Sequence, residues 1–342
     1  MTRMNPLEHD FWNDLVTASE GYSFFHSSNW AKVLNESYGY SPVYIGSAGE
    51  SSFRTLVPAM EVRSILTGTR GVSLPFTDYC NPIGGPENEL QNAFDFLVDY
   101  GRRAHWRYVE LRGLKYFEKD VPGYNAFYHH ELQLTEDEES MASAFEDYTR
   151  RNIKKAERLG LVAEFSKTLD AVKEFYRLHC MTRKLHGMPP QPFSFFRNVH
   201  EYVIAKGFGV VVLVKYEGRN IAGAVFFHLG EQVIFKYSAS DRRYQSLRPN
   251  NILVWAAINR FAKNGYKSLS FGRTEMSGEG LRRFKNSWGA REEIIKYYHY
   301  DLAKNSFVTL ARDKTEAYDR IFNKMPVPLL RITGALLYRH MG

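Results

Sequence analysis

Residues 209–240 read GVVVLVKYEGRNIAGAVFFHLGEQVIFKYSAS, and this stretch decides the fold. Branched and aromatic side chains dominate it, and residues of these kinds favour strands. Two short polar breaks, at Glu217-Gly218 and at Gly230-Glu231, are typical of hairpin turns. The stretch therefore predicts an antiparallel meander whose strands are joined by tight turns.

The segments that follow the meander extend this pattern. Apolar residues at helical spacing predict a helix over 250–264, and a strand is expected over 267–271. A loop from 272 to 280, a short basic helix ending near Trp288-Gly289 and an aromatic-rich strand come next. Chemistry usually sits in such a loop, because rigid elements hold it on both sides. The order meander, helix, parallel strand is that of an acetyltransferase-like (GNAT) fold.

The first half of the chain shows a similar order of elements. Ser27 or Ser28 is expected to cap a helix that Gly39 closes. Strands, a helix and a further strand are then expected over 42–46, 54–63, 71–74, 89–104 and 108–111. Asp78 and Tyr79 stand at the centre of a loop rich in proline and glycine. We therefore predict an α/β (α+β) fold with two related units in tandem, each with a mixed sheet covered by helices.

We expect domain boundaries near Leu134 and Leu302. The expected parts are a first domain over 1–135, a second domain over 136–305 and a C-terminal tail over 306–342. In the tail, basic residues punctuate an apolar run, which is the make-up of a basic amphipathic segment. The tail is expected to pack on the first domain, and contact with an anionic membrane surface is the alternative.

Composition indicates which classes of partner and which cell compartment to expect. The chain has 342 residues and a net charge of +7, which favours anionic partners such as phosphate groups, nucleic acid or an acidic membrane surface. Cys80 and Cys180 have no metal-ligand or disulfide spacing, which favours a reducing compartment. Signal-peptide and membrane-spanning patterns are not found. We expect a cytoplasmic protein, with peripheral contact at the inner face of the membrane as the alternative.

Five segments carry a resemblance to a known family. In chain order they are SNWAKVLNESYGYSP, TRRNIKKAERLG, TRKLHGMPPQPFSFFRNV, YSASDRRYQSLRPNNILVWAAI and FGRTEMSGEGLRRFKNSWGA. Together they resemble the Fem family of peptidoglycan-bridge aminoacyltransferases (FemABX) and its FemAB-like relatives tied to exopolysaccharide systems. The similarity covers nearly the whole chain to about Leu302. It implies two tandem GNAT-like domains, an acyl donor carried on tRNA and an amine acceptor on a cell-wall precursor.

The resemblance implies a catalytic pair in the second domain. Phe284-Lys285 matches the Phe-Lys pair that the family uses near the reacting acyl group. A lysine there stabilises negative charge on the carbonyl oxygen or on the departing ribose without a covalent intermediate. The alternative for Phe284 is core packing against Trp288, four residues later on the same helix.

The remaining donor-side candidates surround this pair. We expect the donor to lie beside Lys285, Arg273 and Tyr237, with Asn250 as a further substrate-binding candidate. Arg273 and Glu275 could instead form a surface ion pair.

The acceptor is expected to enter near Lys32 and Asp78-Tyr79. By resemblance, Lys32 follows a Trp-Ala pair and binds a phosphate of the precursor, although a lone helix lysine more often faces solvent. The family carries a second phosphate-binding arginine where this chain has Gln191. Arg183 or Lys184 are the candidates to replace it.

Two further positions depart from expected patterns. GNAT enzymes usually hold the pyrophosphate of acyl-CoA with backbone N–H groups of a glycine-rich loop. At that place this chain reads DRRYQSLRPNNIL, which has no glycine, although its arginines can bind phosphate with their side chains. Arg112-Gly113 stands where some Fem enzymes carry an acidic residue. The general base therefore stays open between Asp78, Glu110 and the substrate itself.

The basic helix over 149–159 is the candidate for contact with tRNA. It presents Arg151, Lys154, Lys155 and Arg158 along one side without interleaved aromatic residues. Such a face binds a phosphate backbone at most, and a solvated helix face is the commoner explanation.

These observations predict an acyltransferase that moves an aminoacyl or acyl group to an amine of a cell-envelope glycoconjugate or of a peptidoglycan or exopolysaccharide precursor. No cofactor or metal is expected, because the donor is a co-substrate: aminoacyl-tRNA, acyl-CoA or an acyl carrier. The expected partners are an anionic small-molecule or lipid-linked glycan precursor, with tRNA as a candidate. The alternatives are an acyl-CoA- or acyl-carrier-dependent N-acyltransferase in polysaccharide assembly and a non-catalytic GNAT-like binding protein.

Overall fold

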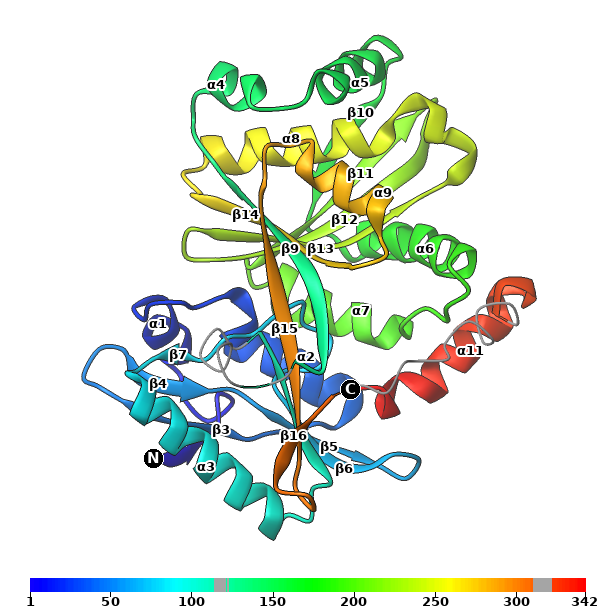
Figure 1. Cartoon of the computed structure of the whole chain (residues 1–342). Helices are drawn as coiled ribbons and strands as arrows, with labels where there is room; N and C mark the ends of the chain where they lie inside the picture. Colours follow the sequence, from blue (N-terminus) through cyan, green and yellow to red (C-terminus); the bar gives the residue numbers. More distant parts are fainter. Residues whose placement is uncertain (114–120, 122, 310–321) are drawn as a thin grey trace. The chain divides into compact units, whose positions relative to one another are not determined.

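The computed structural model describes residues 1–113, 121, 123–309 and 322–342. Figure 1 shows the course of the chain. Its contacts divide the chain into two compact units. The first comprises Met1–Tyr128, Ile294–Asp313 and Leu337–Gly342, and the second comprises His129–Glu293 and Lys314–Leu336.

These units are not contiguous in sequence, unlike the domains expected over 1–135 and 136–305. The physical reason is the pairing of β15 (Arg291–Asp301). Its C-terminal half pairs with β8 (Tyr108–Arg112) of the first unit, from Tyr297 opposite Arg112 to Asp301 opposite Tyr108. The tail is divided as well: α11 (Val327–Leu337) belongs to the second unit up to Leu336, and the residues after it belong to the first.

The first unit holds two sheets. One has the order β1-β3-β4-β7, with bounds Thr2–Met4, Tyr44–Ala48, Phe53–Val57 and Ile83–Gly84. The other runs β15-β8-β6-β5-β2 with β16 beside β15, and the bounds not yet given are Gly68–Val72 (β6), Met60–Ser64 (β5), Ser41–Pro42 (β2) and Ser306–Val308 (β16). The second sheet is mixed, because β6 and β8 are parallel and β5 and β6 are antiparallel.

The strand expected over 54–63 was wrong as a single element. The chain breaks between β4 and β5, and these two strands belong to different sheets. Pro58 lies in the break and has no N–H to donate to a ladder.

The helices described in the first unit are α1 (Trp12–Thr17), η1 (Phe24–His26), α2 (Ser28–Tyr38), α3 (Glu87–Arg103) and η5 (Tyr338–His340). α2 and α3 lie where the sequence predicts helices. The predicted cap of α2 is confirmed, because Ser27 Oγ accepts a hydrogen bond from the N–H of Trp30 at 3.2 Å. Gly39 closes the helix with φ of 73°, as predicted.

The sheet of the second unit confirms the meander. It has the order β10-β11-β12-β13-β14-β9, with bounds Val162–Ser166, Gly209–Tyr216, Arg219–Leu229, Gln232–Ser240, Ser268–Glu275 and Asn125–Gln133. Both hairpin turns lie where the sequence predicts them. β13 and β14 pair in parallel, with Gln232 opposite Ser268. The sheet is therefore mixed, as expected of a GNAT-like fold.

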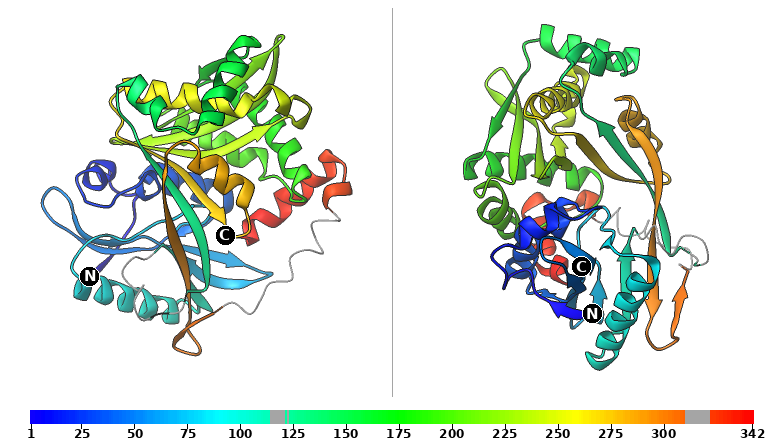
Figure 2. Two further views of the ribbon diagram at one scale, coloured as in Figure 1. Left: turned by 45° about the horizontal axis from the view of Figure 1, so that its top comes forward. Right: turned by 90° about the vertical axis from the view of Figure 1, so that its left-hand side faces the viewer.

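Helices cover both faces of this sheet (Figure 2). Besides α11, the helices described in the second unit are α4 (Glu138–Ser143), α5 (Asp147–Arg158), α6 (Leu169–Leu185), α7 (Phe193–Val199), η3 (His200–Ile204), η4 (Arg242–Leu247), α8 (Pro249–Lys263) and α9 (Glu279–Asn286). α8 packs on one face, where the ring centroids of Phe261 and Phe226 are 5.6 Å apart. α6 packs on the other face, where Phe175 lies beside Gly223.

The loop expected from Gly272 is shorter than predicted. β14 continues to Glu275, so Gly272 and Arg273 belong to the strand. Glycine suggested a loop, but here Gly272 adopts φ of 67° within the strand, a conformation that glycine reaches without strain.

A buried histidine makes the second unit sensitive to acid. His179 on α6 is 5% exposed, and neither ring nitrogen has a hydrogen-bond partner among the described residues. Its ring packs against the rings of Phe175, Phe196 and Tyr237. Burial, with the charge of Arg183, lowers the pKa of His179 from 6.5 to about 3. As the pH falls, His179 therefore takes up a proton in the unfolded chain at a higher pH than it does in the folded chain.

Stability from this histidine is present above pH 6.5 and is lost as the pH falls toward about 3. We expect His179→Phe to flatten the fall in unfolding free energy between pH 6.5 and pH 4, measured by urea unfolding. His186→Gln at the exposed C-cap of α6 is the control and should keep the wild-type dependence. Equal slopes for the two variants would contradict the assignment.

Candidate active site

A pocket of about 600 Å³ lies in the second unit. It is bordered by the C-terminal end of α6, by β13, by η4 and the N-terminal end of α8, and by α9. Its lining residues are Thr182, Leu185, His186, Phe235, Ser238, Ala239, Ser240, Arg242, Gln245, Asn250, Leu253, Gly280, Leu281, Phe284 and Lys285. Apolar and polar side chains thus line the pocket in similar numbers, and convergent polar groups beside apolar ones are typical of a small-molecule site.

Three of the sequence-predicted residues meet in this pocket. Phe284 and Lys285 line it from α9, and Asn250 lines it from the first turn of α8. Leu281, Phe284 and Lys285 have the spacing of one helix face, which explains why α9 presents them together. Phe284 also packs against Trp288, with ring centroids 6.0 Å apart, so its core-packing role and its pocket position coexist.

Lys285 is the best-defined charged group of the pocket. Its side chain is 4% exposed, and its ammonium group donates to the carbonyl oxygens of Gly272 and Arg273, each at 2.9 Å. A buried ammonium group is tolerated only where acceptors compensate for lost water. The end of β14 and the helix α9 therefore touch, and together they hold a fixed positive charge in the pocket wall.

The neighbouring face of α9 is anchored by a carboxylate. Glu292 accepts from Arg282 at 2.7 and 2.6 Å, from Asn286 at 3.0 Å, and lies 3.0 Å from Nε2 of His130. These hydrogen bonds, led by that of Arg282, lower the pKa of Glu292 to about 2. Burial, followed by the charge of Lys285, lowers the pKa of His130. The carboxylate thus fixes the orientation of the helix that presents Lys285.

The N-terminal end of α8 adds positive potential to the pocket. Arg248 adopts φ of 66° before Pro249, and no side chain caps this helix end. A helix N-terminus carries a partial positive charge. Arg242 lines the same pocket, whereas Arg243 is paired with Asp241 at 2.6 Å. Phosphate or carboxylate groups would find side-chain and helix-end donors here in place of a glycine-rich loop.

Tyr237 lies outside this pocket, on the opposite face of β13. Its ring packs against Phe195 and Phe196 of α7. A β-bulge explains the placement: Val225 pairs with Tyr237 and Phe226 with Phe235, so one residue of β13 is extra. Bulges re-aim side chains, and Phe235 and Tyr237 consequently face opposite sides.

The donor-side candidate Arg273 and the phosphate-binding candidates Arg183 and Gln191 belong to the second unit but do not line this pocket. Arg273 is 3.9 Å from Glu275, the surface ion pair that the sequence analysis left open. Arg183 donates to the carbonyl oxygen of Pro189 at 3.3 Å. Gln191 is 5% exposed and stands just before α7.

The acceptor-side candidates belong to the first unit. Lys32 forms a half-exposed ion pair with Glu36 at 2.8 Å. The carbonyl oxygen of Asp78 accepts from the hydroxyl of Tyr297, and the ring of Tyr79 packs against Gly113. As for the general base, Glu110 accepts from Arg112 at 2.7 Å. Asp78 and Glu110 both lie close enough to Arg112 to act on its charge, and Tyr79 lies beside Gly113, so these candidates gather at the end of β8, whereas Lys32 lies on α2.

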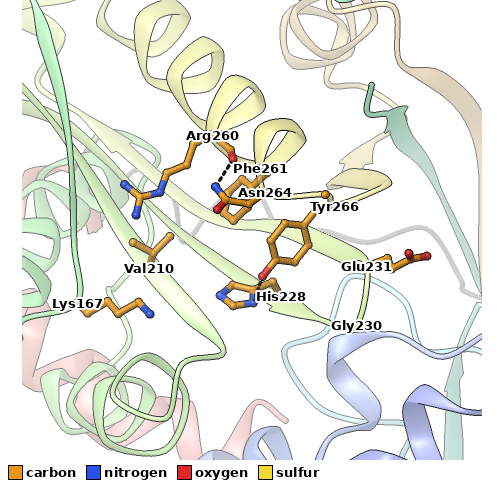
Figure 3. Close-up of a pocket in the computed structure, with 10 residues that line it drawn as sticks. Lys167, Val210, His228, Gly230, Glu231, Arg260, Phe261, Asn264 and Tyr266 are labelled. Atoms are coloured by element: carbon orange, nitrogen blue, oxygen red, sulfur yellow. Dashed lines mark hydrogen bonds between the residues drawn. The ribbon is translucent and has the colours of Figure 1, made fainter. Parts of the chain in front are cut away.

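A second hollow, of about 470 Å³, lies near the C-terminal end of α8 (Figure 3). His228 and Tyr266 form its base, with Nδ1 of His228 2.8 Å from the tyrosine hydroxyl. Lys167 and Arg260 flank it, and the carboxylate of Glu231 points away. Burial, with the charge of Lys167, lowers the pKa of His228 to about 4. The carbonyl end of α8 carries negative potential, which makes this hollow the weaker candidate for an anionic donor.

Comparison with known proteins agrees with this geometry. Residues 143–286 match the model of a family described as acetyltransferase (GNAT) domain. The matched residues lie within the second unit. This match covers α5, the meander, α8 and α9, and therefore every element that borders the pocket around Lys285. A search of curated proteins found no match to the sequence.

Solved structures extend the likeness beyond the GNAT domain. FemX has 14% identity and a TM-score of 0.69, with 89% of this chain and 98% of FemX covered. L-PGS from Bacillus licheniformis has 12% identity and a TM-score of 0.54, with 95% and 100% covered. The C-terminal domain of a protein described as lysylphosphatidylglycerol synthetase, from Agrobacterium fabrum, has 16% identity and a TM-score of 0.54, with 79% and 86% covered. The predicted tandem GNAT-like architecture, shared with FemX, is confirmed.

Within residues 1–113, 121, 123–309 and 322–342, no helix has the length and apolar character needed to cross a bilayer. In the same ranges, His, Cys, Asp and Glu side chains do not gather in groups that could hold a metal ion.

Sequence reasoning missed the anchoring pair His130 and Glu292. These residues are 162 positions apart, and their contact depends on β9 and β15. His130 lies between His129 and Glu131 on its strand, a pattern that gives no sign of its partner. The acidic pair Glu292-Glu293 comes soon after the predicted basic helix, but this position does not identify His130 as its partner.

The contacts of Lys285 predict a structural cost for its removal. Lys285→Met keeps the length of the side chain but leaves two carbonyl oxygens without their donor, so we expect a loss of about 3 kcal/mol in unfolding free energy. Urea unfolding measures it. Lys263→Met, in an exposed pair with Glu138, should cost less than about 0.5 kcal/mol. A similar small cost for both would show that the buried hydrogen bonds of Lys285 contribute little.

Proposed function

We propose that this protein transfers an acyl or aminoacyl group to an amine of a cell-envelope glycoconjugate or of its precursor. The observation that carries this proposal is the buried ammonium group of Lys285 in the wall of the pocket, beside the N-terminal end of α8. A GNAT domain supplies the acyl-transfer framework, and the FemX-like architecture supports the two-unit arrangement.

The proposed reaction is direct transfer. The acceptor amine attacks the carbonyl carbon of the donor, a C–N bond forms, and the bond from that carbon to the donor's oxygen or sulfur breaks. The proton of the amine goes to the leaving oxygen or sulfur, through a base or through the substrate itself. Lys285 stabilises the negative charge on the carbonyl oxygen, which is an electrostatic contribution. No covalent enzyme intermediate is required, and positioning does most of the remaining work.

Aminoacyl-tRNA is the donor that we favour. The chain lacks the glycine-rich loop with which GNAT enzymes usually cradle acyl-CoA, and η4 with Arg248 in a left-handed conformation takes its place. Two of the similar structures carry the names L-PGS and lysylphosphatidylglycerol synthetase. On α5, Arg151, Lys154 and Arg158 are exposed and suit contact with a phosphate backbone.

The acceptor is proposed to be an anionic or lipid-linked glycan precursor of the peptidoglycan or exopolysaccharide kind. Lys32, Asp78 and Tyr79 of the first unit are its candidate contacts. Such an acceptor is handled in the cytoplasm, at the inner face of the membrane. Acyl-CoA or an acyl carrier is the second donor candidate, because Arg242 and the end of α8 offer donors to a pyrophosphate.

Two asparagines at opposite ends of α8, Asn250 and Asn264, provide a matched test of whether the donor binds in the pocket. We expect Asn250→Ala to weaken binding of aminoacylated total tRNA about five- to tenfold, the loss of one hydrogen bond. Asn264→Ala, in the hollow of Figure 3, should leave it unchanged. Filter binding with aminoacylated and deacylated tRNA measures both, and the aminoacylated form should bind more tightly.

The alternatives predict other results in the same experiment. Acetyl-CoA binding with micromolar affinity, lost in Asn250→Ala, would favour the acyl-CoA version and contradict tRNA as donor. Binding of neither donor, together with retained binding of a nucleotide-linked sugar, would favour a non-catalytic GNAT-like binding protein. An equal effect of the two asparagine variants would remove the pocket from the proposal.

A further inference from the structure

The helix α11 presents an apolar face to solvent. Leu329, Ile332 and Leu336 are 53%, 58% and 65% exposed. Their spacing of three and four residues places them on one face of the helix. Exposed apolar residues that occur singly are ordinary, but a contiguous row on one helix face marks an interaction site.

The opposite face of α11 is fixed, so the helix cannot turn this row inward. Leu330 is fully buried, and Gly334 packs against the turn that precedes α7. A Cβ added at Gly334 would stand 1.9 Å from the carbonyl oxygen of Pro190, which only glycine avoids. The guanidinium group of Arg331 stacks on the ring of Tyr176 at 5.2 Å. The exposure of Leu329, Ile332 and Leu336 is therefore a consequence of how α11 packs.

The charges around this face have a single sign. The sequence from Phe322 to Gly342 contains Lys324, Arg331, Arg339 and His340 and no Asp or Glu. Arg331 directly precedes Ile332 and so lies about 100° from it around the helix. Lys324 and Arg331 are exposed. An apolar stripe flanked by basic groups matches the interface of an anionic bilayer, where acyl chains lie below a layer of phosphate groups.

We propose that α11 binds the surface of a membrane containing anionic lipid. Leu329, Ile332 and Leu336 enter the boundary between headgroups and acyl chains, and the exposed Lys324 contacts the lipid phosphates, while Arg331, held on Tyr176, adds positive charge beside the stripe. The stripe is short, so the binding is reversible and depends on the charge of the lipid. This inference goes beyond the acyl transfer proposed above and does not depend on it.

Co-sedimentation with vesicles tests this surface. The full chain should bind vesicles of equal parts phosphatidylglycerol and phosphatidylcholine, should bind pure phosphatidylcholine weakly, and should dissociate as salt is added. In the variant Ile332→Ser/Leu336→Ser we expect affinity to fall about tenfold for each side chain. Val162→Ser is the matched control, because Val162 is 54% exposed on β10 of the same unit, and it should bind like the wild type.

Each other outcome has a defined meaning. Wild-type affinity of the double variant, or equal binding of the wild type to neutral and anionic vesicles, would overturn the proposal. So would self-association of the wild type that the double variant abolishes, which would assign the face to a second copy. Melting temperatures close to that of the wild type are expected, because the substituted side chains are exposed. Donor binding measured on the double variant keeps this test separate from that of the acyl-transfer site.

Discussion

The structure around the pocket depends on one interaction, the hydrogen bonds from the ammonium group of Lys285 to the carbonyl oxygens of Gly272 and Arg273. They join α9 to the end of β14 and place a positive charge in the pocket wall, where we propose that the carbonyl oxygen of the donor develops negative charge. A lysine with such acceptors is both a structural bridge and a preorganised source of potential, so it needs no reorganisation during the reaction. Glu292 holds the same helix from its other face through Arg282 and Asn286.

Much of the fold was predictable because its signals are local. Hairpin turns at fixed positions, a serine cap and a closing glycine specify β11 to β13 and α2 within short stretches of sequence. The predictions were wrong where strand pairing between residues far apart in the sequence determines the structure. β4 and β5 read as one strand because Pro58 is a weak break in the sequence, and β14 continues past Gly272. The two units alternate along the sequence because β15 returns to pair with β8.

The candidate site was only partly predictable. Phe284 and Lys285 came from a family pattern, and the structure brings them together with Asn250 in one pocket. Tyr237 shares its strand parity with Phe235 and was expected at the donor. A bulge of one residue, which has no signature in the sequence, turns it to the other face. The contact of His130 with Glu292 is equally invisible, because it joins strands far apart in the chain.

The most direct measurement is a crystal structure with a non-hydrolysable aminoacyl-adenosine, a mimic of the charged end of tRNA. The acyl group is predicted to lie in the pocket of Phe284, Lys285 and Asn250, with its carbonyl oxygen on the side of the Lys285 ammonium group. Adenosine density in the hollow of Lys167, Arg260 and His228, with the first pocket empty, would contradict the proposed donor site.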